Sequence, residues 1–168
     1  MSVWAKALKN YLKAQAWPEA GRCLEQLKNW PEALKCYERA GDYLGQARCH
    51  GQLGNWRQAA LCYGKLSDWA KAAQCFENLE EWSKAAKNHE KALNWQAAAR
   101  CHEQAADWKS AGRCYRKVEE WGNAGRCYEN IADWKNAARC YEVVPDQLKL
   151  ANCLENSGNF AAAASCYE

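Results

Sequence analysis

Hydrophobic residues recur along this chain with a period of thirteen residues. All ten Trp residues lie on one grid of that spacing, which begins at Trp4, and Tyr43 and Phe160 occupy two of its other points. All eleven Cys residues lie on the same grid displaced by six positions. No insertion or deletion disturbs this frame, in which thirteen repeats fit and the last one stops early. Such self-similarity predicts a single tandem array over residues 1–168.

Each repeat is expected to contain one amphipathic helix that ends before the next repeat begins. With the Trp position counted as 0, apolar residues favour positions 0, 3, 4, 6, 7 and 10, and polar residues favour positions 1, 2, 5, 8, 9 and 12. At about 100° per residue, the apolar positions cover roughly 160° of a helical surface. A continuous helix would turn each Trp by roughly 220° from the previous one, so that no common apolar face would survive. The helix must therefore break once in every repeat.

The residues before each grid position indicate where the helices break. In nine repeats the residue directly before the grid position is Asn or Asp, whose side chain can accept hydrogen bonds from free N–H groups at a helix start. These residues are Asn29, Asp42, Asn55, Asp68, Asn94, Asp107, Asp133, Asp146 and Asn159. Gly41, Gly54, Gly158 and Pro145 lie one residue earlier, where the chain leaves one helix and enters the next. We expect helices of about ten residues joined by turns of about three, and connections that short make neighbouring helices antiparallel.

The predicted fold is all-α: an α-solenoid of right-handed type, with about thirteen short antiparallel helices in two layers. One repeat alone is too small to offset the entropy of ordering its chain, whereas stacking lets each helix share its apolar face with neighbours on both sides. Small residues at positions 3 and 4, such as Ala98 with Ala99 and Ala124 with Gly125, are expected to let the helices approach closely. Trp and Tyr side chains are expected to fill the space between the layers.

Composition and charge restrict the classes of partner and compartment. With 49% hydrophobic and 26% charged residues, the chain can bury a core and remain soluble. The net charge of +3 indicates neither a nucleic acid nor a membrane surface as partner. The sequence contains no apolar run long enough for a membrane span and no targeting pattern at its start. Cytoplasmic localisation in a reducing environment is expected.

Eleven Cys and three His residues raise the question of a metal or redox site. No Cys lies in the close spacing of a zinc motif, and reduced thiols buried as small hydrophobic residues are favoured over a disulfide ladder or a metal site. His50, His89 and His102 each occupy repeat position 7, directly after the grid position of Cys, where Tyr or Phe stands in most other repeats. We interpret them as aromatic substitutes, because no acidic or nucleophilic partner recurs beside them. We therefore expect no metal, no cofactor and no enzymatic activity, and the sequence has no common catalytic motif.

One segment carries a resemblance to a known repeat family. The stretch GDYLGQARCHGQLGNWRQAALCYGKL resembles a tetratricopeptide hairpin, in which a GDY or GNW turn opens a helix that carries AxxCY or AxxYY. The resemblance extends over essentially the whole chain at the level of this helix. The period differs, since a tetratricopeptide unit has about 34 residues and two dissimilar helices. The resemblance implies a non-enzymatic scaffold that binds peptides or protein partners.

Basic residues form one organised row on the polar face. Most repeats carry Arg or Lys at position 5, and Glu often follows three residues later, at position 8. On a helix these residues are neighbours, so a solvated row of ion pairs is the favoured interpretation. The alternative is a surface for acidic peptide segments, for which the candidate residues are Arg48, Arg100, Arg113, Arg126 and Arg139. Nucleic acid is not an expected partner, because Glu neutralises the row and the aromatic residues are used in the core.

The terminal repeats suggest contacts between copies of the chain. A free solenoid needs polar end caps, whereas the first and last repeats here carry apolar residues available for contact. These residues are Trp4, Ala7, Tyr11, Phe160, Ala163 and Tyr167. Met1 of a second copy placed after Glu168 would resume the grid with one position missing, and such a contact, if it does not close, produces a filament. The alternative is that the chain is a piece of a longer array.

Two functional hypotheses follow from the sequence. The leading one is a non-enzymatic protein–protein interaction scaffold that binds a protein or peptide partner, with an acidic partner favoured by the Arg row. The alternative is a self-assembling structural protein that forms head-to-tail filaments. Neither hypothesis involves a membrane or a cofactor.

Overall fold

The computed structural model describes residues 2–144 and 146–167, which form helices joined by short turns, without a β-strand. The thirteen helices in this part of the chain are α1 (Val3–Lys13), α2 (Trp17–Gln26), α3 (Trp30–Ala40), α4 (Tyr43–Gln52), α5 (Trp56–Lys65), α6 (Trp69–Glu77), α7 (Trp82–Lys91), α8 (Trp95–Gln104), α9 (Trp108–Lys117), α10 (Trp121–Glu129), α11 (Trp134–Val143), α12 (Gln147–Asn156) and α13 (Phe160–Ala164). Helices α1 to α12 have 9 to 11 residues, as the period predicts. The turn expected at Pro145 and the join expected between Met1 and Glu168 lie outside the described residues.

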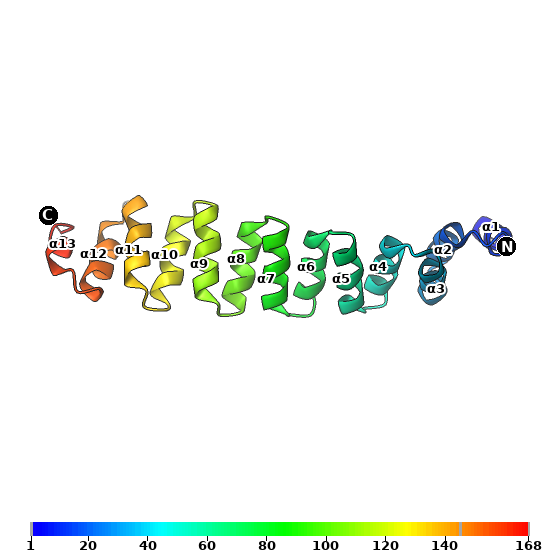
Figure 1. Cartoon of the computed structure of the whole chain (residues 1–168), viewed down its shortest axis with the longest axis horizontal. Helices are drawn as coiled ribbons and strands as arrows, with labels where there is room; N and C mark the ends of the chain where they lie inside the picture. The colour runs from blue at the N-terminus through cyan, green and yellow to red at the C-terminus, as the bar shows by residue number, and fades with distance from the viewer. Residues whose placement is uncertain (1, 145, 168) are drawn as a thin grey trace. The chain divides into compact units, whose positions relative to one another are not determined.

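The chain divides into two compact units, Met1–Glu81 with α1 to α6 and Trp82–Glu168 with α7 to α13. Within each unit, consecutive helices pack against each other and alternate in direction (Figure 1). Helices two apart lie in the same layer, and side-chain hydrogen bonds connect them, as between α7 and α9. The predicted solenoid of short antiparallel helices in two layers is therefore confirmed within each unit. The thirteen-residue sequence frame passes through the boundary between the units without interruption.

The predicted Asn and Asp caps begin the helices. The side chain accepts a hydrogen bond from a backbone N–H of the first turn at eight of the nine predicted positions. Asp107, for example, accepts from the N–H of Ser110 at 3.1 Å. Asn55 is the exception, since it precedes α5 without a side-chain hydrogen bond. Each cap satisfies an N–H group that has no partner within the helix.

Every turn except that between α11 and α12, which includes a position outside the described residues, contains one residue in the left-handed region of backbone space. The three glycines predicted in turns, Gly41, Gly54 and Gly158, have φ values of 67°, 74° and 82°. Eight other turns place a non-glycine residue at the same repeat position, with φ between 54° and 60°. These residues are Gln15, Lys28, Ser67, Glu80, Leu93, Ala106, Glu119 and Ala132. A side chain in this conformation costs about 1 kcal/mol, so the packing of the helices imposes the turn even where the residue disfavours it.

The core consists of small residues and Tyr, with the Trp rings at its border. Most Ala residues at repeat positions 3 and 4 and ten of the eleven Cys residues are buried, and the rings of Tyr37 and Tyr141 are almost completely covered. Trp108 and Trp121 pack against the core of the second unit but remain partly exposed. The expectation that Trp fills the space between the layers is therefore correct only in part. Position 0 is the first residue of the helix, so its ring covers an edge of the core next to the turn.

Small residues allow the close approach that the sequence predicts. Ala98, Ala99 and Ala124 have no exposed surface. At Gly125 on α10, an added Cβ would lie 2.6 Å from Cζ of Tyr141 on α11. The absence of a side chain at this position therefore makes room for the Tyr ring of the following helix.

Candidate functional site

The two layers of helices differ chemically at repeat position 9. Helices with even numbers carry an exposed amide there, and we call these residues the amide row. The amide row consists of Gln26, Gln52, Asn78, Gln104, Asn130 and Asn156. Odd-numbered helices carry a basic residue at the same position, namely Lys13, Arg39, Lys65, Lys91 and Lys117, with Val143 as the exception. The chemical period is thus 26 residues, and one helix pair with two dissimilar members is the true repeating element.

The basic residues of the odd-numbered helices cover aromatic rings of the preceding helices. The guanidinium of Arg39 lies 4.7 Å from the ring centre of Trp17, and the ammonium of Lys117 lies 3.3 Å from that of Trp95. Such cation–π contacts stabilise by about 0.5–1 kcal/mol at exposed sites. At Trp17 and Trp95, which are partly exposed, a cation thus covers a face of the ring that solvent would otherwise contact.

The amide row lines a groove in the first unit. This first groove has a volume of about 400 Å³ and extends over α2, α4 and α6, with Gln26, Gln52 and Asn78 among its lining residues. Trp30 and Trp56 add apolar surface. The groove therefore combines hydrogen-bonding amides with aromatic rings, which is the lining expected for a peptide ligand.

The same surface recurs six repeats later in the second unit. A second groove of about 570 Å³ lies on α8 and α10 and contains Gln104 and Asn130 of the amide row. The two grooves differ in charge. Glu25, Arg48 and Lys71 line the first groove and leave one positive charge, whereas Glu103, Arg126 and Glu129 line the second and leave one negative charge.

The five candidate Arg residues do not share one environment. Arg48 is half-buried and pairs with Glu25 of α2, with Nε 3.0 Å from Oε1. The other four, Arg100, Arg113, Arg126 and Arg139, are exposed. Arg126 lines the second groove, whereas Arg139 lines a separate hollow of about 390 Å³ beside α12. Their role in partner binding stays a prediction.

The carboxylates expected beside the Arg row have other partners. Glu103 and Glu129, expected to pair with Arg100 and Arg126 on the same helices, accept hydrogen bonds from Tyr and Cys side chains of the two following helices. Arg126 donates to Asn123, with Nη2 2.6 Å from Oδ1. The side chains of these two Glu residues therefore face the following helices, which a helical projection of a single repeat does not show.

These contacts define a recurring group that we call the Tyr triad. It joins Glu at position 8 of one helix, Tyr at position 7 of the next and Cys at position 6 of the helix after that, so its members are 12 residues apart. In the best example, Tyr115 OH donates to Glu103 Oε2 at 2.8 Å, and Cys127 Sγ donates to Glu103 Oε1 at 3.6 Å. Glu129, Tyr141 and Cys153 repeat the arrangement, with distances of 3.0 and 3.6 Å.

Burial and the shared carboxylate keep the Tyr and Cys side chains of the Tyr triad protonated. Burial raises the pKa of Cys127 to about 12, and the Glu103 carboxylate adds to the rise. The pKa of Tyr115 is also raised, first by burial and then by its hydrogen bond to Glu103. These thiols are poor nucleophiles, because the reactive form of Cys is the thiolate. Among the described residues no disulfide joins two Cys residues, and ten of the eleven Cys are buried.

One group has the same architecture with His in place of Tyr, and we call it the His triad. His102 Nε2 lies 3.1 Å from Glu90 Oε1, and Cys114 Sγ donates to the same oxygen at 3.5 Å. The three ligand atoms lie within 4.8 Å of one another. The ring of His102 and the thiol of Cys114 are buried. Burial and Glu90 raise the pKa of Cys114 to about 12.

The expectation that the His residues have no acidic or nucleophilic partner is therefore wrong for His102. Its partners come from α7 and α9, twelve residues before and twelve residues after it, and are not its neighbours in sequence. The signal that would have found them was present: Glu at position 8, His at position 7 and Cys at position 6 in three successive repeats.

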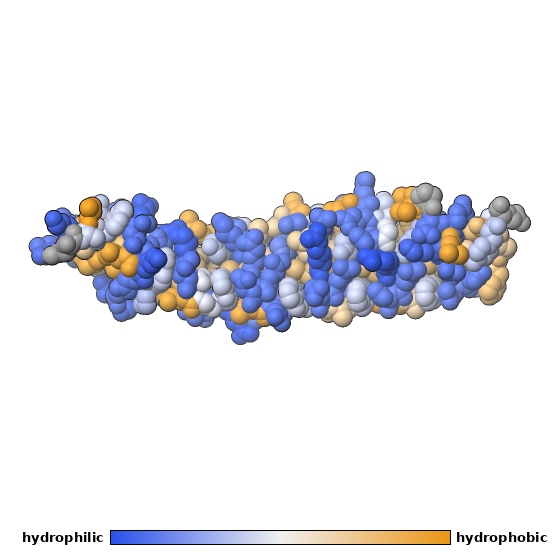
Figure 2. Space-filling model, turned by 180° about the vertical axis from the view of Figure 1, so that it is seen from behind, coloured by the Kyte–Doolittle hydropathy of each residue, from blue (hydrophilic) through white to orange (hydrophobic). Residues whose placement is uncertain are grey.

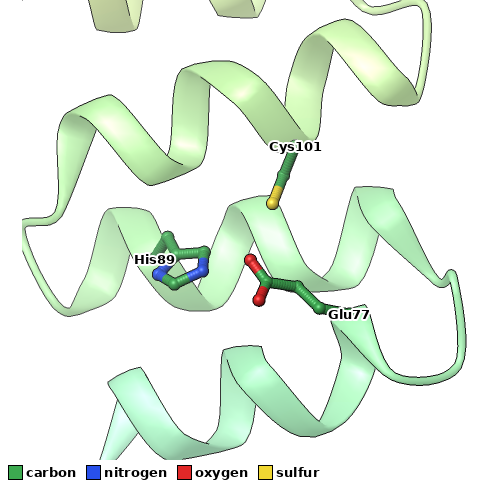
Figure 3. Close-up of side chains that lie close together, drawn as sticks. All are labelled: Glu77, His89 and Cys101. Carbon is green, nitrogen blue, oxygen red and sulfur yellow. The ribbon is translucent and has the colours of Figure 1, made fainter.

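The other two His residues differ in their surroundings. His89 of α7 and Cys101 of α8, both in the second unit, also place ligand atoms within 4.8 Å of each other; Figure 3 shows both side chains. Glu77, the third side chain drawn there, is the last residue of α6 in the first unit. His50 is half-buried, burial lowers its pKa, and its Nδ1 has no hydrogen-bond partner among the described residues.

The candidate residues at the ends of the chain are mostly exposed. The exposed fractions are 46% for Trp4 and 69% for Phe160, and Tyr11 and Tyr167 are exposed as well. Ala163 is buried, and Ala7 is half-buried. End-to-end contact through these residues stays a prediction.

The surface and the helix lengths add two further findings. Over the face drawn in Figure 2, hydrophilic residues predominate, and hydrophobic side chains lie between them in small groups. Within residues 2–144 and 146–167, no helix combines the length and the apolar character that crossing a bilayer requires.

The sequence matches no protein-family model, and it matches none of the curated proteins.

Proposed function

We propose that the protein is a non-enzymatic interaction scaffold of tetratricopeptide-like helical repeats that binds an extended peptide segment of a partner protein. The observation that supports this proposal most directly is the first groove, in which three amides of the amide row lie beside two Trp rings. A side-chain amide offers both donors and an acceptor, and it can therefore bind the N–H and C=O groups of a peptide main chain. Recognition of this kind depends little on the peptide's side chains.

The spacing of the amide row suits an extended chain. Helices in direct contact lie about 8–10 Å apart, and if the helices of one layer have the same spacing, it is close to the length of three residues of extended peptide at about 3.3 Å each. Successive amides of one layer would then contact every third residue of the ligand. The 26-residue chemical period also brings the protein closer to the tetratricopeptide pattern, since each element pairs two dissimilar helices.

Charge favours an acidic peptide in the first groove. Lys71 and Arg48 outnumber Glu25 there, whereas the second groove carries the opposite balance. A peptide with acidic side chains should therefore bind the first unit in preference to the second. In this proposal Arg48 contributes to binding, and the exposed Arg residues of the second unit contribute less.

The test is selection of peptides from a random twelve-residue library on the purified chain, followed by calorimetry. Each lost amide hydrogen bond costs about 0.5–1.5 kcal/mol, so a variant with Gln26→Ala, Gln52→Ala and Asn78→Ala should bind the selected peptides about 10-fold or more weakly. Gln58→Ala, which removes an exposed amide of α5 outside the groove, is the matched control and should bind normally. Failure to enrich any peptide, or equal binding by the triple variant, would refute the proposal.

Self-association is the second candidate function, and the exposure of Trp4 and Phe160 supports it. In this proposal α13 of one copy packs against α1 of the next. Light scattering over a wide range of protein concentration should show a mass that grows with concentration, and Phe160→Glu should abolish this growth. A mass that stays at that of one chain at every concentration would exclude the filament.

A further inference from the structure

We propose that Glu90, His102 and Cys114 form a zinc site between α7, α8 and α9. The three side chains supply a carboxylate oxygen, an imidazole nitrogen and a sulfur, which are the three kinds of ligand that zinc takes from proteins. They come from three consecutive helices of one compact unit, so the site would tie these helices together. The proposal is independent of the peptide groove, because none of these residues lines it.

The distances fit tetrahedral coordination with small adjustments. Zinc lies about 2.0–2.3 Å from its ligands, so two ligand atoms in a tetrahedral site are about 3.3–3.8 Å apart. Glu90 Oε1 lies 3.1 Å from His102 Nε2 and 3.5 Å from Cys114 Sγ. All three atoms are within 4.8 Å of one another. Three protein ligands leave the fourth position for water.

A second carboxylate lies close to the other nitrogen of the imidazole. Asp107 Oδ2 lies 3.5 Å from His102 Nδ1, on the side of the ring opposite to Glu90. A small rotation of the ring would bring Nδ1 within hydrogen-bond distance of this carboxylate, and such a hydrogen bond is common for zinc-bound His. Asp107 also caps α9, the helix that carries Cys114, by accepting from the N–H of Ser110. One residue thus lies beside one ligand and fixes the start of the helix that provides another.

The charge balance suits a buried site. His102 and Cys114 have exposed fractions of 6% and 2%, so an ion bound there would be largely withdrawn from water. A divalent zinc ion with one carboxylate and one thiolate has no net charge, which reduces the cost of burial. Binding requires Cys114 to lose its proton, and the proton leaves to solvent as the sulfur–zinc bond forms.

The Tyr triads supply the internal control for this proposal. They have a Glu and a Cys at the equivalent repeat positions, but a Tyr phenol replaces the His imidazole. The phenol donates a hydrogen bond to the Glu. If the His triad were only a hydrogen-bond network, exchanging His and Tyr should change stability alone. If it is a metal site, replacing its His by Tyr should abolish metal binding there, and replacing the Tyr of a Tyr triad by His should create a metal site.

The experiment uses the full chain with His50→Tyr and His89→Tyr, which leaves His102 as the single His, and Co²⁺ as a spectroscopic probe. This chain should bind one equivalent of Co²⁺ with a thiolate-to-cobalt charge-transfer band, and Zn²⁺ should displace it. A further His102→Tyr exchange should abolish the band. Zinc at a hundredfold excess over Kd should raise the melting temperature by about 5 °C.

A variant that gains a second metal site provides the more decisive part of the experiment. Tyr115→His in the same chain completes a second His triad with Glu103 and Cys127 and should raise the stoichiometry from one Co²⁺ to two. Tyr128→His is the matched control, because Arg116 stands in the position of the Glu, and it should leave the stoichiometry at one.

The proposal is overturned if the single-His chain has the circular dichroism of the unmodified protein but shows no cobalt band, or if the band survives His102→Tyr. Should the double Tyr exchange fail to fold, the unmodified chain with Cys114→Ser or Glu90→Gln decides the question. Each variant should lose one equivalent of Co²⁺, whereas Cys140→Ser should lose none, and equal stoichiometry in all three would reject the site.

Discussion

The His triad and the Tyr triad centred on Tyr115 occupy equivalent places in consecutive repeats, and only their central residues differ in type. In both, a half-buried Glu accepts from a Cys two helices later, at 3.5 Å in one case and 3.6 Å in the other. The central residue is His102 in one and Tyr115 in the other, and both lie close to the shared carboxylate. The repeat thus fixes positions and distances, and a single side chain decides whether the group is a hydrogen-bond network or a set of metal ligands.

The largest expected difference between the two triads is in the stability that the central residue contributes, because the ring of Tyr115 is larger than that of His102. Tyr115→Ala should lower the free energy of unfolding by about 3–5 kcal/mol, because it leaves a cavity of aromatic size and removes the donor to Oε2 of Glu103. His102→Ala removes a smaller ring and should cost about half as much in metal-free buffer. Urea denaturation of both variants measures the difference. Equal losses would mean that the ring contributes by its hydrogen bond alone.

The fit between a Tyr and the preceding helix predicts the next largest effect. Gly125→Ala places a methyl group 2.6 Å from Cζ of Tyr141, and relief of this contact should cost about 1–3 kcal/mol. Gly122→Ala on the same helix meets no atom within 4 Å and should stabilise by up to about 1 kcal/mol, because Ala is the better helix former. Thermal melting of the two variants should therefore shift in opposite directions. A shift of the same sign would show that the Tyr ring relocates freely.

The raised pKa values of the Tyr triad predict loss of stability at alkaline pH. In the unfolded chain Cys127 and Tyr115 lose their protons near the ordinary pKa values of 9.0 and 10.0, whereas the folded chain keeps them to higher pH. The free energy of unfolding should therefore be constant below about pH 8.5 and fall above pH 9, by up to about 1.4 kcal/mol per pH unit for each group. Urea titrations from pH 7 to 11 measure the slope, and Tyr115→Phe should reduce it. An unchanged slope in that variant would assign the alkaline loss to other residues.

The smallest effect concerns the turn that joins the central His to the next helix. Ala106 has φ of 56°, and Ala106→Gly should stabilise by about 0.5–1 kcal/mol, because glycine tolerates this conformation. Gly54→Ala, at the equivalent position of an earlier turn, should destabilise by a similar amount. A change of melting temperature in the predicted direction for one variant only would indicate that the turns differ in strain.

Much of the fold could be predicted from the sequence, because it follows from a regular pattern. The grid of Trp and Cys residues located the helices, and the Asn and Asp residues before it located their starts. The left-handed residues at Leu93 or Ala106 could not be predicted in this way, since neither residue favours that conformation. There the packing of neighbouring helices overrides the local preference.

The candidate sites were harder to predict, because their residues meet only after the helices stack. Glu90, His102 and Cys114 are twelve residues apart, and their proximity depends on two antiparallel turns. The amide row is present in the sequence as an alternation of amide and basic residues with a period of 26 residues. Aligning all repeats on the thirteen-residue period mixes the two residue types at position 9 and conceals the alternation. Comparing each repeat with the next but one, instead of with the next, reveals both features.

The alternation at repeat position 9 has a consequence for how such a chain can gain or lose length. Adding or deleting one thirteen-residue repeat would move every following helix to the opposite layer, so that amides would face where cations had been and the groove would be interrupted. Adding or deleting two repeats would preserve both surfaces. The array should therefore tolerate changes in copy number only in even steps, because only an even change keeps the amides in one layer and the cations in the other.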